Sequence, residues 1–177
     1  MKKLILITLA TFICITALNR LTAQDYNIDL AQYYKEKGKE YSKEGKSIEA
    51  LACFQSSILH YPDSYYSHLM AGITCHELSL YASMIRYFKN VVEMEPYDTY
   101  SHGNLGAIYA EMGYDENAFK SLNKALDINP EYAHAYNNLG AMIMRHGKYQ
   151  ESIATLRKAT EYKPSMPDGW FNIGVAY

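Results

Sequence analysis

Residues 135–142 read "AYNNLGAM", and two other stretches are close copies of it, "HGNLGAIY" at 102–109 and "WFNIGVAY" at 170–177. In each stretch an Asn is followed by Leu or Ile and then by Gly, and these asparagines, Asn104, Asn138 and Asn172, are 34 residues apart. The same spacing separates four prolines and five glycines: Pro62, Pro96, Pro130, Pro164, Gly38, Gly72, Gly106, Gly140 and Gly174. Two residue types on one period of this length indicate a solenoid.

Each repeat is predicted to be a pair of helices joined by a tight turn. In the unit at 133–164, apolar and small residues follow helical spacing on both sides of "RHGKY": Tyr136, Leu139, Gly140, Ile143, Ile153, Leu156 and Ala159. Gly147 lies in the turn, where a left-handed residue can end the first helix at little steric cost. The proline then ends the second helix because it cannot continue one. Ser79 replaces this glycine in the second unit, which predicts a looser turn there.

The recurrent glycine inside the first helix calls for a packing reason, because glycine costs about 1 kcal/mol relative to alanine in a helix. We expect it to allow close approach of the second helix. The residues predicted to face the glycines are mostly small, and larger ones fill the space beside them: Ala50, Met84, Ala118 and Ser152, then Phe54, Phe88, Leu122 and Leu156.

This pattern resembles the tetratricopeptide repeat. The family motif is matched in 99–130 by His102, Leu105, Gly106, Tyr109, Ala118, Leu122, Ala125 and Pro130, and in 133–164 by Tyr136, Leu139, Gly140, Ile143, Ser152, Leu156, Ala159 and Pro164. His68 and His102 stand where the family usually has an aromatic residue. The resemblance covers 31–177.

The resemblance implies an all-α fold, a right-handed α-solenoid of antiparallel helix pairs. We assign four full repeats, 31–64, 65–98, 99–132 and 133–166, and a truncated fifth at 167–177. Trp170, Ile173 and Tyr177 in the fifth unit are expected to lack part of their packing, which favours self-association through this end or continuation into a longer chain.

The first residues have the order of a secretory signal peptide: Lys2 and Lys3, an apolar run from Leu4 to Leu18, and a small residue, Ala23, at the expected cleavage site. Residues 1–23 are therefore predicted to be removed and 24–30 to form a linker, giving a periplasmic or secreted protein. The run is shorter than the ~20 residues of a membrane-spanning helix, so no stable membrane insertion is expected after cleavage. The alternative is anchoring by an uncleaved signal.

Charge and cysteine content limit the possible functions. Loss of Lys2, Lys3 and Arg20 leaves 14 of the 17 basic residues against 19 acidic ones, a net charge of −5, so no nucleic-acid partner is expected. Cys53 and Cys75 allow either one disulfide or two small buried hydrophobic residues. We find no phosphate-binding loop, nucleophile motif or closely spaced histidine ligand pair, and so predict no metal, no cofactor and no enzyme activity.

The predicted binding surface is the concave groove lined by the first helix of each pair. If Leu139 and Gly140 face the paired helix, Asn138 and its neighbour Asn137 lie toward the groove. Asn104 and Asn172 share the repeat position of Asn138, and Met70 takes it in the second unit. A side-chain amide both donates and accepts hydrogen bonds, so this row could hold the backbone of an extended peptide.

The resemblance adds that asparagines at corresponding positions line the repeat groove of O-linked N-acetylglucosamine transferases. An alternative is that these asparagines only satisfy local hydrogen bonds. We therefore expect an exported scaffold that binds a protein or extended peptide through Asn104, Asn137, Asn138, Asn172 and Met70. The competing hypothesis is that these repeats select the substrate of a larger, glycosyltransferase-like enzyme whose catalytic domain lies beyond residue 177.

Overall fold

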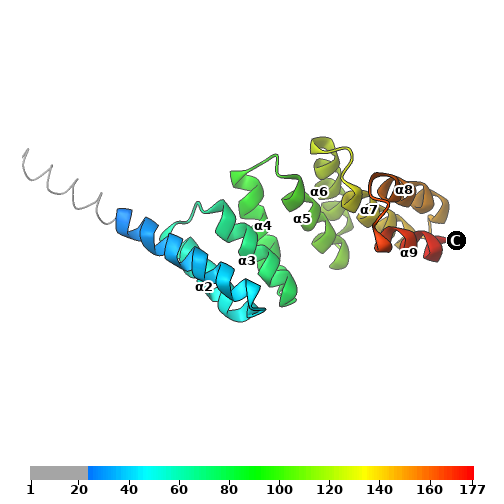
Figure 1. The fold of residues 1–177 in the computed structure, drawn as a ribbon. Coiled ribbons are helices and arrows are strands. Elements are labelled where there is room, and N and C mark those ends of the chain that lie inside the picture. The colour runs from blue at the N-terminus through cyan, green and yellow to red at the C-terminus, as the bar shows by residue number, and fades with distance from the viewer. Residues whose placement is uncertain (1–23) are drawn as a thin grey trace, which may run out of the picture. The chain divides into compact units, whose positions relative to one another are not determined.

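The computed structural model describes residues 24–177, so the predicted signal peptide lies outside the described residues. Within 24–177 the chain forms helices and no strands (Figure 1), which confirms the all-α prediction. The helices are 24–43, α2 (Ser47–His60), α3 (Tyr65–Glu77), α4 (Tyr81–Met94), α5 (Thr99–Glu111), α6 (Asp115–Ile128), α7 (Ala133–Arg145), α8 (Tyr149–Tyr162) and α9 (Pro167–Ala176). None of these helices is both long and apolar enough to span a bilayer.

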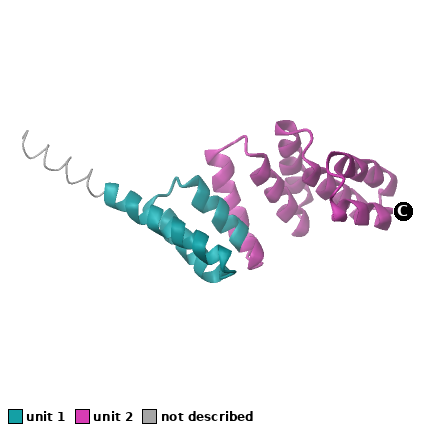
Figure 2. Ribbon diagram, viewed as in Figure 1, with its two compact units in different colours: residues 1–74 teal, residues 75–177 magenta. Residues whose placement is uncertain are grey.

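The chain divides into two compact units, Met1–Thr74 and Cys75–Tyr177 (Figure 2). In the second unit, α5 packs on α6 and α7 on α8 as helical hairpins, α4 packs on α5, and α9 packs on α8. The first helices of successive hairpins, α5, α7 and α9, also contact one another in order. This arrangement produces a continuous row of first helices, as a solenoid requires.

Residues 24–30 were expected to be a linker, but they are helical and form the first part of helix 24–43. Side chains of this helix contact the last residue of α2: Asn27 Oδ1 lies 3.2 Å from His60 Nδ1, and the Tyr34 ring stacks on the His60 ring with centroids 5.8 Å apart. Packing against α2 therefore begins before the repeat boundary that we inferred from the sequence.

The turn inside each hairpin uses a left-handed residue. Gly45, Gly113 and Gly147 have φ between 72° and 77°, and Ser79 has φ 57°. Ser79 N–H donates to His76 O at 3.0 Å, matching the bond from Gly113 N–H to Ala110 O at 3.2 Å. The prediction of a looser turn at Ser79 is thus wrong, because the hydrogen bonds that end the helix hold serine in the conformation that glycine adopts elsewhere.

Three of the mid-helix glycines, Gly38, Gly106 and Gly140, do allow close approach, although their direct neighbours are the large residues rather than the small ones. A Cβ on Gly140 would lie 2.5 Å from Leu156 Cγ, and one on Gly38 would lie 2.6 Å from Phe54 Cε1. The small residue Ser152 approaches the backbone instead, and its hydroxyl donates to Gly140 O at 2.8 Å. The second helix therefore places a bulky side chain in the space that the missing Cβ leaves.

A ring N–H binds the carbonyl of the preceding proline at the start of three first helices. His68 Nε2 donates to Pro62 O at 2.9 Å, His102 Nε2 to Pro96 O at 3.1 Å, and Trp170 Nε1 to Pro164 O at 2.9 Å. The two histidines that depart from the family pattern therefore make the same bond as the tryptophan.

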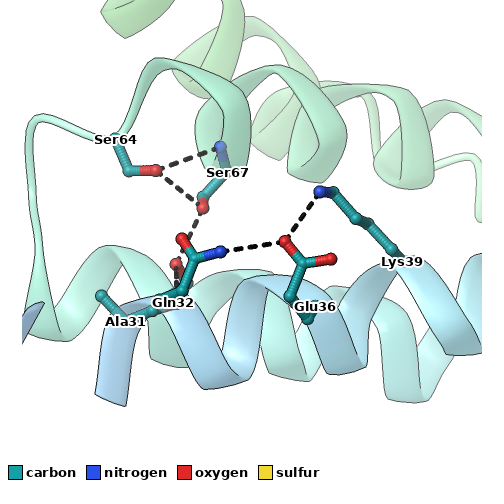
Figure 3. A network of polar contacts seen from close by, with 7 residues as sticks. Ala31, Gln32, Glu36, Lys39, Ser64 and Ser67 are labelled. Carbon is teal, nitrogen blue, oxygen red and sulfur yellow. Dashed lines mark hydrogen bonds and ion pairs between the residues drawn. The ribbon is translucent and has the colours of Figure 1, made fainter. Parts of the chain in front are cut away.

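Three serines form a polar network in the first unit (Figure 3). Ser57 Oγ donates to Ala31 O at 2.8 Å and lies 2.8 Å from Ser67 Oγ, which also accepts from Ser64 Oγ. Ser57 and Ser67 are both fully buried, so the network joins the first helical hairpin to the start of α3. On helix 24–43, close to Ala31, the Glu36 carboxylate accepts hydrogen bonds from Gln32 Nε2 and Lys39 Nζ.

The serine at the same repeat position in the second unit has no such partner. Ser101 is fully buried, and its hydroxyl is the one buried side-chain polar atom in residues 24–177 without a hydrogen bond. Val91 occupies the repeat position of Ser57, the partner of Ser67. At the α4–α5 contact, valine therefore provides no hydroxyl that could bind Ser101.

Cys53 and Cys75, the two cysteines in residues 24–177, are free thiols. Cys75 is fully buried, whereas Cys53 is only partly buried. Burial raises the pKa of each thiol, which favours the unreactive protonated form.

Candidate functional site

The row of first helices in the second unit carries four of the five predicted binding residues. Asn104 lies on α5, Asn137 and Asn138 on α7, and Asn172 on α9, and all four are half-buried. Met70 is also half-buried but lies on α3 in the first unit. The candidate site therefore consists of residues on α5, α7 and α9.

The four amides differ in what is left for a ligand. Asn172 Nδ2 donates to Asn137 Oδ1 at 3.0 Å, so these two side chains bridge α9 and α7. Asn104 Nδ2 donates to Tyr100 O, one turn earlier in its own helix, at 2.8 Å. Among residues 24–177, no hydrogen bond engages the Asn138 side chain. Asn138 is thus the amide that keeps both its donor and its acceptor for a partner.

Asn138 borders a shallow hollow of about 220 Å³ between α5 and α7. Its other lining residues are Ala110, Glu111, Ala141, Met142 and Arg145. The lining combines an amide, a carboxylate and a guanidinium with apolar side chains, and these groups suit a peptide segment better than a small apolar ligand.

Arg145 holds the hollow together. Its guanidinium donates to Ala110 O at the end of α5, at 2.7 Å, and to Asp115 at the start of α6, at 3.0 Å. Asp115 also accepts from His146 Nε2 at 2.7 Å. A cation at the carbonyl end of α5 and a carboxylate in the first turn of α6 both complement the helix dipoles. Arg145 was not predicted from the sequence, although a basic residue in the last turn of a helix is a recognised signal.

The carboxylate of the hollow, Glu111, accepts a 2.8 Å hydrogen bond from the hydroxyl of Tyr81. This bond raises the pKa of Tyr81, because removing its proton would place two anions side by side. Tyr81 thereby fixes the direction in which Glu111 points.

His134, in the first turn of α7, accepts a hydrogen bond from Lys163 Nζ at 3.0 Å. Burial lowers the pKa of His134, and the ammonium of Lys163 lowers it further. The imidazole is therefore neutral at pH 7 and serves as an acceptor. In residues 24–177 no three His, Cys, Asp or Glu side chains converge so as to hold a metal ion.

Large side chains remain exposed on α9 and at the residue that follows it, Tyr177. Trp170, Phe171 and Tyr177 are 55%, 71% and 79% exposed, while Ile173 is buried. The expectation of incomplete packing thus holds for Trp170 and Tyr177 and is wrong for Ile173. Self-association through this helix stays a prediction.

These features define a class of protein. Residues 106–147 and 142–177 match the model of the TPR repeat family, and the helices recur on a 34-residue period from α2 onward. Residues 106–177 therefore resemble tetratricopeptide repeats, and the helices before them continue the same period.

Solved structures of such proteins have the same fold. The crystal structure of MamA superimposes with a TM-score of 0.76 at 22% identity, covering 84% of this chain and 81% of that one. MamA from Desulfovibrio magneticus RS-1 gives 0.75 at 20% identity, with 84% of each chain covered. YrrB, described as a TPR protein with an unusual peptide-binding site, gives 0.66 at 19% identity, covering 81% and 74%.

The predicted α-solenoid class is therefore confirmed, and at these identities the likeness concerns the fold alone. A search of curated protein sequences gave no match.

Proposed function

We propose that this chain is a non-enzymatic interaction scaffold that binds an extended segment of a partner protein along α5, α7 and α9. The observation that carries the proposal is the unengaged amide of Asn138 beside the hollow it shares with Glu111 and Arg145. Asn104 supplies a second acceptor, since only its NH₂ group is engaged. Amides bind peptide N–H and C=O groups without selecting side chains, so Glu111 and Arg145 provide the selectivity.

Export belongs to the same proposal, because the basic, apolar and small-residue regions at 1–23 favour a cleaved leader. Mass spectrometry of the protein from its native host tests this point. A mature N-terminus at Gln24 supports export, whereas an intact Met1 in the cytoplasmic fraction contradicts it.

Affinity capture with the exported chain as bait, followed by calorimetry with the captured partner, tests the binding surface. Asn138→Ala should weaken binding about three- to tenfold, because one or two hydrogen bonds are lost. Asn104→Ala is the matched control at the same repeat position, and its effect should be smaller because its NH₂ group already binds its own helix. Equal affinities for the wild type and Asn138→Ala would remove the asparagine row as the binding surface.

A further inference from the structure

Two other hollows in the second unit lie between second helices, which make little direct contact with each other. The larger, about 700 Å³, lies among α4, α5 and α6, with Leu105 and Tyr109 of α5 among its lining residues. Its charged residues include Lys89, Lys120 and Lys124, and we call it the lysine hollow. None of the asparagines discussed above lines it.

The lysine hollow carries unbalanced positive charge. Among the described residues, Lys89 and Lys120 form no ion pair, and the Lys124 ammonium lies 5.7 Å from the centre of the Tyr97 ring. A single carboxylate, that of Asp127, lines the hollow beside these three cations. The chain as a whole carries a net charge of −2, so this is a local concentration of positive charge on an acidic protein.

The second hollow, about 530 Å³, lies on the other side of α6. Its apolar lining is Phe119, Leu139, Met142 and Ile143, and we call it the phenylalanine hollow. Phe119 is 56% exposed, whereas the residue at the same repeat position is 8% exposed in Leu51 and 5% exposed in Ile153. Ile85, at the same position in the second repeat, is half-buried, so Phe119 is the most exposed of the four and the only aromatic one among them. A large exposed ring of this kind is typical of a binding contact.

The charged residues around the phenylalanine hollow are paired with one another. Asp115 accepts from Arg145 and His146, and the Lys148 ammonium lies 3.8 Å from Glu151. This hollow therefore offers apolar surface, whereas the lysine hollow offers unpaired cations. The two share α6 as their common wall, with Phe119 on one side and its neighbour Lys120 on the other.

We propose that the two hollows form one docking surface for an extended acidic segment of a partner protein, a surface that none of the predicted binding asparagines lines. Carboxylates of the segment bind Lys89, Lys120 and Lys124, and an apolar side chain packs on Phe119. An α-helix is about 10 Å across and an extended chain advances about 3.3 Å per residue. The apolar and acidic residues of the partner are therefore about three residues apart.

Fluorescence anisotropy with synthetic peptides tests this proposal on residues 24–177. The probe is a labelled peptide with Leu-Phe, a Ser-Gly-Ser spacer and Glu-Glu-Asp, made in both chain directions. The comparison peptide replaces the acidic residues with Gln-Gln-Asn. We expect the acidic probe to bind in one of its two chain directions, with a dissociation constant in the micromolar to millimolar range. The neutral comparison peptide should bind at least tenfold more weakly. Binding of the acidic probe should also weaken as the salt concentration is raised.

Variants locate the contact. Lys120→Gln combined with Lys124→Gln should reduce the affinity about tenfold, and Phe119→Ala should reduce it independently, since these exposed side chains do not support the fold. Lys158→Gln is the matched control, because Lys158 occupies on α8 the repeat position that Lys124 occupies on α6. Equal losses with Lys158→Gln, equal binding of the neutral peptide, or no binding at millimolar probe would each overturn the proposal.

Discussion

The unpartnered hydroxyl of Ser101 predicts that replacing this buried serine makes the protein more stable. A buried polar group without a hydrogen bond costs about 1–3 kcal/mol, and alanine is also the better helix former. The cap at this helix end is kept, because Asp98 Oδ2 accepts from the backbone N–H of Ser101 at 2.9 Å. Ser101→Ala should therefore raise the free energy of unfolding by about 1–2 kcal/mol, and the melting temperature by a few degrees.

Ser67→Ala is the control for this prediction, because Ser67 occupies the same repeat position with the opposite surroundings. Its hydroxyl pairs with Ser57 and Ser64, so its removal should cost about 0.5–1.5 kcal/mol. Urea unfolding followed by circular dichroism gives both values, and hydrogen exchange in α5 and α3 shows where stability changes. A Ser101→Ala protein that is less stable than the wild type, or two variants that shift in the same direction, would refute the reasoning.

Two further predictions concern packing and pH. Gly140→Ala should destabilise the fold by about 1–2 kcal/mol, because the new Cβ would lie 2.5 Å from Leu156 Cγ. Gly174→Ala should be neutral or stabilising, because no atom lies within 4 Å of the added Cβ. Equal changes in the free energy of unfolding for the two variants, measured by denaturant unfolding, would contradict this prediction. The lowered pKa of His134 means that the unfolded chain binds its proton more readily, so stability falls as the pH drops below 6.5, and NMR titration should give a pKa for His134 that rises in Lys163→Gln. An unshifted His134 titration in both proteins would show that the Lys163 contact has no electrostatic effect.

Much of the fold could be predicted because the signals are local and recur. Four first helices begin at residues 65, 99, 133 and 167, which are the predicted repeat starts. These starts are predictable because the proline, the turn residue and the helical spacing of apolar residues each determine structure within a single repeat. The linker at 24–30 was wrong because contacts with His60, more than 30 residues away, order that segment. Local rules also failed at Ser79, where the helix-ending hydrogen bonds outweigh residue preference.

The candidate site was less accessible to sequence reasoning. The repeat register placed the asparagines correctly on successive first helices, but it treated them as equivalent. Their differences arise between helices: Asn172 reaches Asn137, 35 residues earlier, and Arg145 reaches Ala110 across the same distance. Such contacts depend on how helices cross, and a period alone does not define that angle.

The ring N–H bonds to proline carbonyls bear on how such repeats are recognised. A sequence profile that expects a bulky aromatic residue at this position scores His68 and His102 poorly, although both make the hydrogen bond that Trp170 makes. Residue identity can therefore drift at the position while the hydrogen-bonding role is kept. The same hydrogen bond therefore marks the start of a first helix at His68 and at His102, both of which precede residues 106–177, where the family model matches.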